Sequence, residues 1–215
     1  MNNILIKVEN LVKTFGGLVA LNNCSLEIKD KAITGIIGPN GSGKTTLFNV
    51  ITGNLKPDTG KVFYNGVEIT NEESHDLFHL GVLRTFQIAH EFSNMTVIEN
   101  LMVVPGNQKG EKLLYSLMNS HQIKKEDDII KDKAMEVLKF LKIEHLKNER
   151  AGNLSGGQKK LLELARTMMV DAKIVFLDEV GAGVNKTLLK DISDSILKLN
   201  QDKGYTFCMI EHDFN

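Results

Sequence analysis

The chain has 215 residues, of which 42% are hydrophobic and 25% are charged, so it can bury a substantial core. Its formal net charge of -1 argues against nucleic-acid binding by bulk electrostatic attraction. No apolar run is long enough to cross a bilayer, the first residues lack the pattern of a signal peptide, and two cysteines are too few for a disulfide framework.

Strands are predicted for the start of the chain. Residues 4–8 alternate and are rich in β-branched side chains, and residues 25–28 and 61–64 look similar. A short apolar run over 33–37 predicts a buried strand. A helix is expected over 45–52, so a strand, a tight loop and a helix follow one another.

The loop between that strand and that helix fits the pattern G-x-x-x-x-G-K-[ST]. Glycines in such a loop let backbone N–H groups turn toward a phosphate, and the helix adds the positive end of its dipole. The lysine reaches the β- and γ-phosphates and the hydroxyl ligates Mg²⁺. The loop therefore predicts a nucleoside triphosphate site without identifying the reaction. Its residues are Gly38, Pro39, Asn40, Gly41, Ser42, Gly43, Lys44 and Thr45.

The second half of the chain changes character twice. Residues 96–146 contain one proline and many Lys, Glu, Leu and Met residues, which favours a separate helical lobe. After Gly157 we expect a helix, a strand over 174–177, a helix from Thr187 and a strand over 206–210. Apolar strands that alternate with helices predict a parallel sheet covered on both faces.

A second glycine turn opens the helix after residue 155. Ser155 can cap that helix, and the glycines leave its first amides uncovered, which favours an anion. A simply well-capped helix is the alternative reading of the same residues. The turn reads Leu154, Ser155, Gly156, Gly157 and Gln158.

This pentapeptide resembles the signature sequence of the ATP-binding cassette (ABC) proteins. In that family it binds the γ-phosphate of ATP held by the opposite subunit. The resemblance implies an α/β P-loop NTPase fold with a mixed core sheet, an N-terminal antiparallel β subdomain and an inserted helical subdomain. Residues 1–95 and 147–215 would form the core and about 96–146 the helical subdomain, with the C-terminal end of the family's domain missing. It also adds Thr46 to the ATP-binding residues.

Further motifs of the family occur in order along the chain. Asp178 and Glu179 end an apolar strand. The resemblance implies that Asp178 holds Mg²⁺, directly or through water, and that Glu179 faces the attacking water as general base or polarising group. Gln87 resembles the catalytic glutamine that senses Mg²⁺ and the γ-phosphate. His212 resembles the switch histidine, which contacts the γ-phosphate. Phe15 stands in the place of the aromatic residue that stacks on adenine.

Two residues depart from the family's pattern. Val180 stands where proline usually follows the catalytic glutamate, and this change frees a backbone φ angle that proline would fix. Asn185 stands where the next loop usually ends in aspartate. Neither change removes a predicted phosphate or metal ligand.

Within the family, the chain is similar to the ATPase subunits of bacterial branched-chain amino acid importers. Residues 81–87, 95–100 and 161–166 carry this resemblance. It implies ATP and Mg²⁺ as cofactors, ATP hydrolysis coupled to transport, and a peripheral position on the cytoplasmic face of the membrane. The implied partners are a second ATPase subunit, identical or different, a membrane permease and, indirectly, a periplasmic solute-binding protein.

Other functions remain open from the sequence. Urea-type and lipopolysaccharide-export ATPases share parts of the pattern. A P-loop kinase of small metabolites would suit the chain length, but it has no use for the signature turn. A non-transport cassette normally carries two cassettes or a long coiled coil, so one cassette with a short helical lobe favours a transporter.

Overall fold

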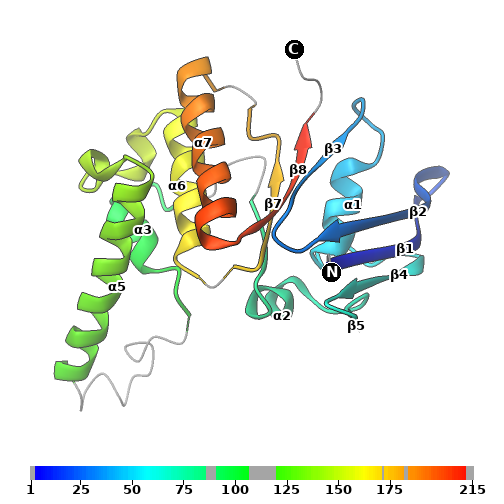
Figure 1. Ribbon diagram of the computed structural model, residues 1–215, viewed down its shortest axis with the longest axis horizontal. Coiled ribbons are helices and arrows are strands. Elements are labelled where there is room, and N and C mark those ends of the chain that lie inside the picture. Colours follow the sequence, from blue (N-terminus) through cyan, green and yellow to red (C-terminus); the bar gives the residue numbers. More distant parts are fainter. Residues whose placement is uncertain (1–2, 86–90, 107–119, 171, 182–183, 212–215) are drawn as a thin grey trace. The chain divides into compact units, whose positions relative to one another are not determined.

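A computed structural model describes residues 3–85, 91–106, 120–170, 172–181 and 184–211 (Figure 1). The chain divides into two compact units, one formed by residues 1–87, 172–182 and 196–215, the other by residues 88–171 and 183–195. Among the described helices, none is both long enough and apolar enough to span a membrane.

An antiparallel sheet opens the first unit, with the strand order β2-β1-β4-β5. Its strands are β1 (Ile4–Phe15), β2 (Leu18–Lys29), β4 (Thr59–Tyr64) and β5 (Val67–Glu68). A two-residue glycine turn joins β1 to β2, and such a short connection requires antiparallel pairing. The strands predicted from alternation are confirmed, and β1 and β2 extend well beyond the predicted runs.

A second sheet in this unit has the order β3-β8-β7-β6, and every pair in it is parallel. It comprises β3 (Ile33–Ile37), β6 (Val82–Arg84), β7 (Ile174–Asp178) and β8 (Thr206–Glu211). The expected mixed core sheet is therefore corrected for the described strands: antiparallel and parallel pairs lie in separate sheets. Long crossovers between these strands permit parallel pairing, which hairpins do not.

Burial within the parallel sheet differs from the sequence prediction at one strand. β7 is buried along its whole length, as its apolar sequence predicts. β3 is only partly covered, and Ile37 is 58% exposed. The prediction of a buried β3 was wrong because β3 is an edge strand of the described sheet, with only β8 beside it. An apolar run alone does not distinguish a central strand from an edge strand.

Helix α1 (Lys44–Ile51) connects the cores of the two sheets. Its Phe48 is fully buried and meets Phe176 of β7 edge to face, with the ring centroids 4.9 Å apart. The same cluster of buried side chains includes Ile6 of β1 and Ile210 of β8. Helix α2 (Ser74–His79) precedes β6 in this unit. α1 is thus fixed on several sides, which gives the loop before it a rigid base.

The second unit is helical in its described part. It contains α3 (Val97–Met102), α5 (Ser120–Phe140), η2 (Glu144–Leu146), η3 (Ala151–Asn153) and α6 (Gly156–Met168), and also the first part of α7 (Lys186–Lys203). Thr96 and Glu99 form a capping box at the start of α3. The helical composition predicted for 96–146 agrees with α3 and α5, while the expected subdomain limits stay a prediction.

Candidate active site

The predicted phosphate loop joins β3 to α1. Gly43, just before the helix, has a φ of 88°, and a Cβ there would lie 2.3 Å from the carbonyl oxygen of Ala20. Conformation and space both require glycine at this position. Lys44 is 7% exposed, and its Nζ donates hydrogen bonds to the carbonyl oxygens of Gly38 (2.7 Å) and Pro39 (2.8 Å). The ammonium group is therefore held against its own loop.

A hollow of about 390 Å³ opens over this loop. Its wall combines the β1–β2 hairpin, the phosphate loop with the start of α1, and the residue after β7. The structure thus places the predicted adenine, phosphate and general-base residues around one space. The lining residues are Phe15, Leu18, Val19, Ala20, Asn40, Gly41, Ser42, Gly43, Lys44, Thr45, Thr46 and Glu179.

Phe15 forms the aromatic part of that wall. Phe15 is 48% exposed at the end of β1, so its ring is accessible to a second ring that stacks on it. Asp58 anchors the end of β1 just before Phe15. Its carboxylate accepts hydrogen bonds from Lys13 Nζ at 2.8 Å and from Thr14 N and Oγ1 at 2.7 Å. The bond from Lys13 and those from Thr14 lower the pKa of Asp58 to about 2, so the anchor stays charged near neutral pH.

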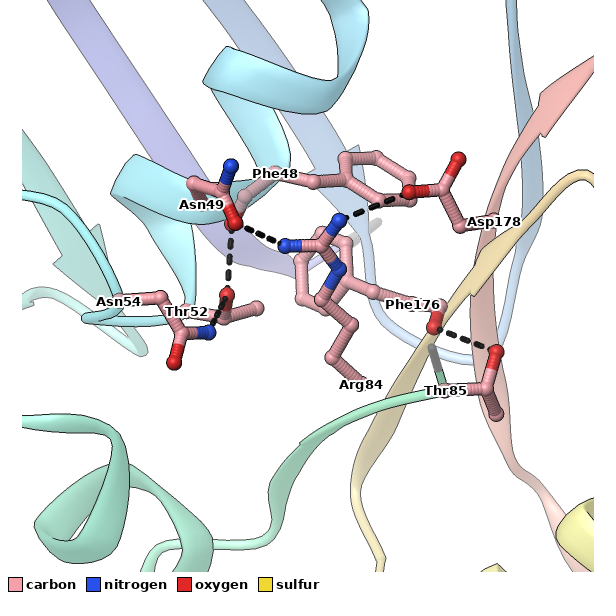
Figure 2. A network of polar contacts seen from close by, with 8 residues as sticks. All are labelled: Phe48, Asn49, Thr52, Asn54, Arg84, Thr85, Phe176 and Asp178. Carbon is pink, nitrogen blue, oxygen red and sulfur yellow. Dashed lines mark hydrogen bonds and ion pairs between the residues drawn. The ribbon is translucent and has the colours of Figure 1, made fainter. Parts of the chain in front are cut away.

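The two carboxylates at the end of β7 have different surroundings. Asp178 is 3% exposed, and its Oδ2 accepts a hydrogen bond from Arg84 Nη2 at 2.7 Å (Figure 2). Its Oδ1 is buried without a hydrogen-bond partner among the described residues. Glu179 has a φ of 50°, a left-handed conformation that costs about 1–2 kcal/mol for a residue with a side chain. This turn separates the two residues: Glu179 lines the hollow and Asp178 stays in the core.

The signature turn begins α6 in the second unit. Ser155 and Gln158 form a capping box: Ser155 N donates to Gln158 Oε1 at 2.9 Å, and Gln158 N donates to Ser155 Oγ at 3.4 Å. Ser155 and Gly156 are exposed, whereas Gly157 is buried. Of the two signature glycines only Gly156 is therefore exposed, because Gly157 faces the side chains of Val184 and Leu188.

Close packing predicts different roles for the two signature glycines. A Cβ at Gly157 would lie 2.1 Å from Leu188 Cδ2, whereas a Cβ at Gly156 would meet nothing within 4 Å. Overpacking of this size costs about 1–3 kcal/mol, so Gly157→Ala should lower the melting temperature by about 2–8 °C. Gly156→Ala is the matched control and should melt like the wild type in a thermal circular-dichroism scan. Equal melting temperatures for both variants would show that Gly157 is not needed for packing.

Two predicted catalytic residues, Gln87 and His212, lie outside the described residues, so their place in the site stays a prediction.

Two residues of structural importance were not predicted from the sequence. Arg84 pairs with Asp178, and Asn185 caps α7 by accepting a hydrogen bond from Leu188 N at 2.9 Å. Nothing in the sequence around Arg84 indicates an ion pair with a distant aspartate. The role of Asn185 could have been predicted, because asparagine before a helix is a preferred cap.

Comparison with known proteins finds a matching family and similar proteins within it. The family described as ABC transporter matches residues 21–182. The probable branched-chain amino acid transport ATP-binding protein LivG of Methanocaldococcus jannaschii is 46% identical over 208 residues, which are 97% of this chain and 80% of that protein.

Solved structures agree with the fold. A crystal structure of the ADP conformation of an ATP-binding cassette has a TM-score of 0.82 and 43% identity, and the match covers 99% of this chain and 82% of that chain. The dimeric structure of a bacterial ABC transporter cassette has a TM-score of 0.77 and 26% identity, covering 97% of this chain and 88% of that chain. These similarities confirm the predicted α/β P-loop NTPase fold.

Proposed function

The chain belongs to the ABC transporter family as one of its ATP-hydrolysing cassettes, and from this premise we propose that it supplies half of a two-subunit ATPase that drives import of branched-chain amino acids. Cassettes of this family bind nucleotide and function with membrane permease components.

One observation carries the catalytic part of the proposal. The hollow over the phosphate loop is lined by Lys44 and also by Glu179, which come from distant parts of the chain. A cation that binds phosphate and a carboxylate that can take a proton from water are two of the groups that act in γ-phosphate hydrolysis. Phe15 at the same hollow offers a stacking face for a base.

The residues present also fit a Mg²⁺ ion. Asp178 Oδ1 is a buried carboxylate oxygen without a partner among the described residues, and oxygen donors of this kind suit Mg²⁺. Thr45 is exposed at the start of α1 and offers a hydroxyl. We therefore infer that Thr45 and Asp178 hold Mg²⁺, together with Gln87. When bound, Mg²⁺ supplies the charge that neutralises the β- and γ-phosphate oxygens.

Each side chain then has a defined task. Lys44 and the backbone N–H groups of the loop bind the phosphates, and the N-terminus of α1 adds a favourable dipole. Glu179 accepts a proton from the attacking water, with His212 steadying the γ-phosphate. The raised backbone energy of Glu179 is consistent with such a role, since strained residues concentrate at functional sites.

A second subunit completes the site in this proposal. Ser155 and Gly156 are exposed at the start of α6, where the positive end of the helix dipole attracts an anion. We infer that Ser155, Gly156, Gly157 and Gln158 bind the γ-phosphate of ATP held by the partner, identical or related. ATP then lies between the subunits, so its binding is linked to dimer formation.

The transported solute is proposed from the relatives. The matched LivG protein carries branched-chain amino acid transport in its name, which favours that import over urea-type uptake or lipopolysaccharide export. The chain would then lie at the cytoplasmic face of the membrane, bound to a permease that receives solute from a binding protein. Deletion of the gene in its own organism should abolish uptake of labelled leucine and leave urea uptake intact. The opposite pattern would reassign the solute.

Base recognition provides a separate test of the hollow. Stacking on an aromatic ring contributes about 1–3 kcal/mol per base, so Phe15→Ala should weaken ATP binding by about 5- to 150-fold. GTP binding should weaken by the same factor, because a phenyl ring has no hydrogen-bonding edge with which to distinguish the bases. Phe78→Ala is the control, since Phe78 is a partly exposed phenylalanine of α2 that does not line the hollow. Titrations that show a strong, unchanged preference for ATP in Phe15→Ala would place base recognition elsewhere.

A further inference from the structure

Arg84 joins two elements of the candidate site. It ends β6, where it pairs in register with Phe176 of β7, and its side chain is 8% exposed. Nη2 donates to Asp178 Oδ2 at 2.7 Å, and Nη1 donates to Asn49 Oδ1 of α1 (Figure 2). The guanidinium carbon lies 5.9 Å from the centre of the Phe48 ring. One planar group therefore contacts the carboxylate of β7 and a side chain of α1.

The contact with α1 lies on the face that carries a proposed metal ligand. Asn49 follows Thr45 by four residues, and residues four apart lie on the same face of a helix. Arg84 thus connects the helix face of Thr45 with the carboxylate of Asp178. Because the donors of a guanidinium have fixed directions, this contact sets the geometry between the two elements more closely than a flexible ammonium would.

Only one oxygen of Asp178 takes part in the ion pair. Oδ2 is held by Arg84, while Oδ1 has no hydrogen-bond partner in the described part of the chain. A carboxylate bound through one oxygen has a restricted rotation, so the direction of the other oxygen is restricted as well. Groups that orient metal ligands in this way commonly determine metal affinity.

We propose that Arg84 is a positioning residue for the Mg²⁺ site, which orients Asp178 Oδ1 and fixes it relative to Thr45. The inference rests on the proposed function, because it takes Thr45 and Asp178 as ligands. Arg84 itself acts through these two residues and through Asn49. If this is so, the bridge that Arg84 forms between Asp178 and Asn49, and not only the positive charge of Arg84, controls metal binding.

Two variants test the bridge without removing the charge. Arg84→Lys keeps one cation beside Asp178 but cannot span both partners, and Asn49→Ala removes only the contact with α1. Affinity for Mn²⁺ in the presence of ATP, measured by electron paramagnetic resonance, should fall about 10-fold in each variant. ATP binding in EDTA should be unchanged, because the phosphate loop is intact. If Arg84→Lys does not fold, Asn49→Ala decides the question.

Two further variants separate the possible outcomes. Asn54→Ala is the control: Asn54 donates to Thr52 Oγ1 at 3.0 Å in the same polar cluster, and neither residue is bonded to Arg84 (Figure 2). It should bind Mn²⁺ like the wild type. Wild-type affinity in Arg84→Lys and Asn49→Ala would overturn the inference, as would an equal loss of Mn²⁺ and metal-free ATP binding. Wild-type affinity in Asp178→Ala would instead overturn the proposed metal site itself.

Discussion

Replacing Lys44 with alanine is expected to lower ATP affinity by about 100-fold or more. Hydrogen bonds to charged groups contribute about 1.5–3 kcal/mol each, and Lys44 is proposed to reach two phosphates, so a loss of about 3 kcal/mol is the smallest expected effect. The lysine is already held inside the loop by the carbonyl oxygens of Gly38 and Pro39. An ammonium group has three N–H donors, so contacts with two phosphates replace at least one of these carbonyl bonds. Alanine loses all of the phosphate contacts. Isothermal titration with ATP measures the change.

A second lysine variant makes the result specific. Lys61 of β4 is exposed and pairs with Glu68 at 2.9 Å, away from the residues that line the hollow. Lys61→Ala removes the same charge from the chain and should bind ATP like the wild type. Tight ATP binding by Lys44→Ala, equal to that of Lys61→Ala, would contradict the assignment of the phosphate loop.

Much of the fold could be predicted from the sequence because local patterns determine it. Alternation located three strands of the antiparallel sheet, β1, β2 and β4, and the apolar run at 174–177 located β7, which is buried along its whole length. The cap of α6 by Ser155 was also predicted, because a helix cap depends only on residues that are close in the sequence. The position of a strand within its sheet is not local, and the sequence therefore did not show that β3 lies at an edge.

In the candidate site, too, the local features could be predicted from the sequence and the tertiary contacts could not. The phosphate loop and Glu179 were predicted by short motifs, and the structure places both at one hollow. The bridge from Arg84 to Asp178 and Asn49 was not predictable, because its three residues are far apart in the sequence and meet only through tertiary packing. The burial of Gly157 was also missed, since it depends on the side chain of Leu188.

Replacing Glu179 with glutamine is expected to slow ATP hydrolysis by about 100-fold or more, because a general base contributes about 10²–10⁴-fold to the rate. The amide has nearly the same shape as the carboxylate, so ATP binding should persist. If ATP bridges two subunits, slow hydrolysis prolongs the bridge, and ATP-bound dimers should accumulate. Phosphate release assays and light scattering measure the two effects.

Mixing complementary variants tests whether the site is shared between subunits. In the Glu179→Gln background, Ser155→Arg blocks the signature turn and Lys44→Ala disables the phosphate loop. Neither variant alone can form an intact composite site, but a mixed dimer restores one. ATP-dependent dimers should therefore appear only in the mixture. Ser155→Ala controls for the lost helix cap, which costs about 1 kcal/mol of stability.

Light scattering on Glu179→Gln with Mg-ATP tests the central claim most directly, that this chain holds half of an ATP site completed by a second subunit. The account predicts a dimer with Mg-ATP and a monomer with ADP, since the bridging γ-phosphate is then absent. A monomer with Mg-ATP at high protein concentration, in a sample shown to bind ATP, would contradict it.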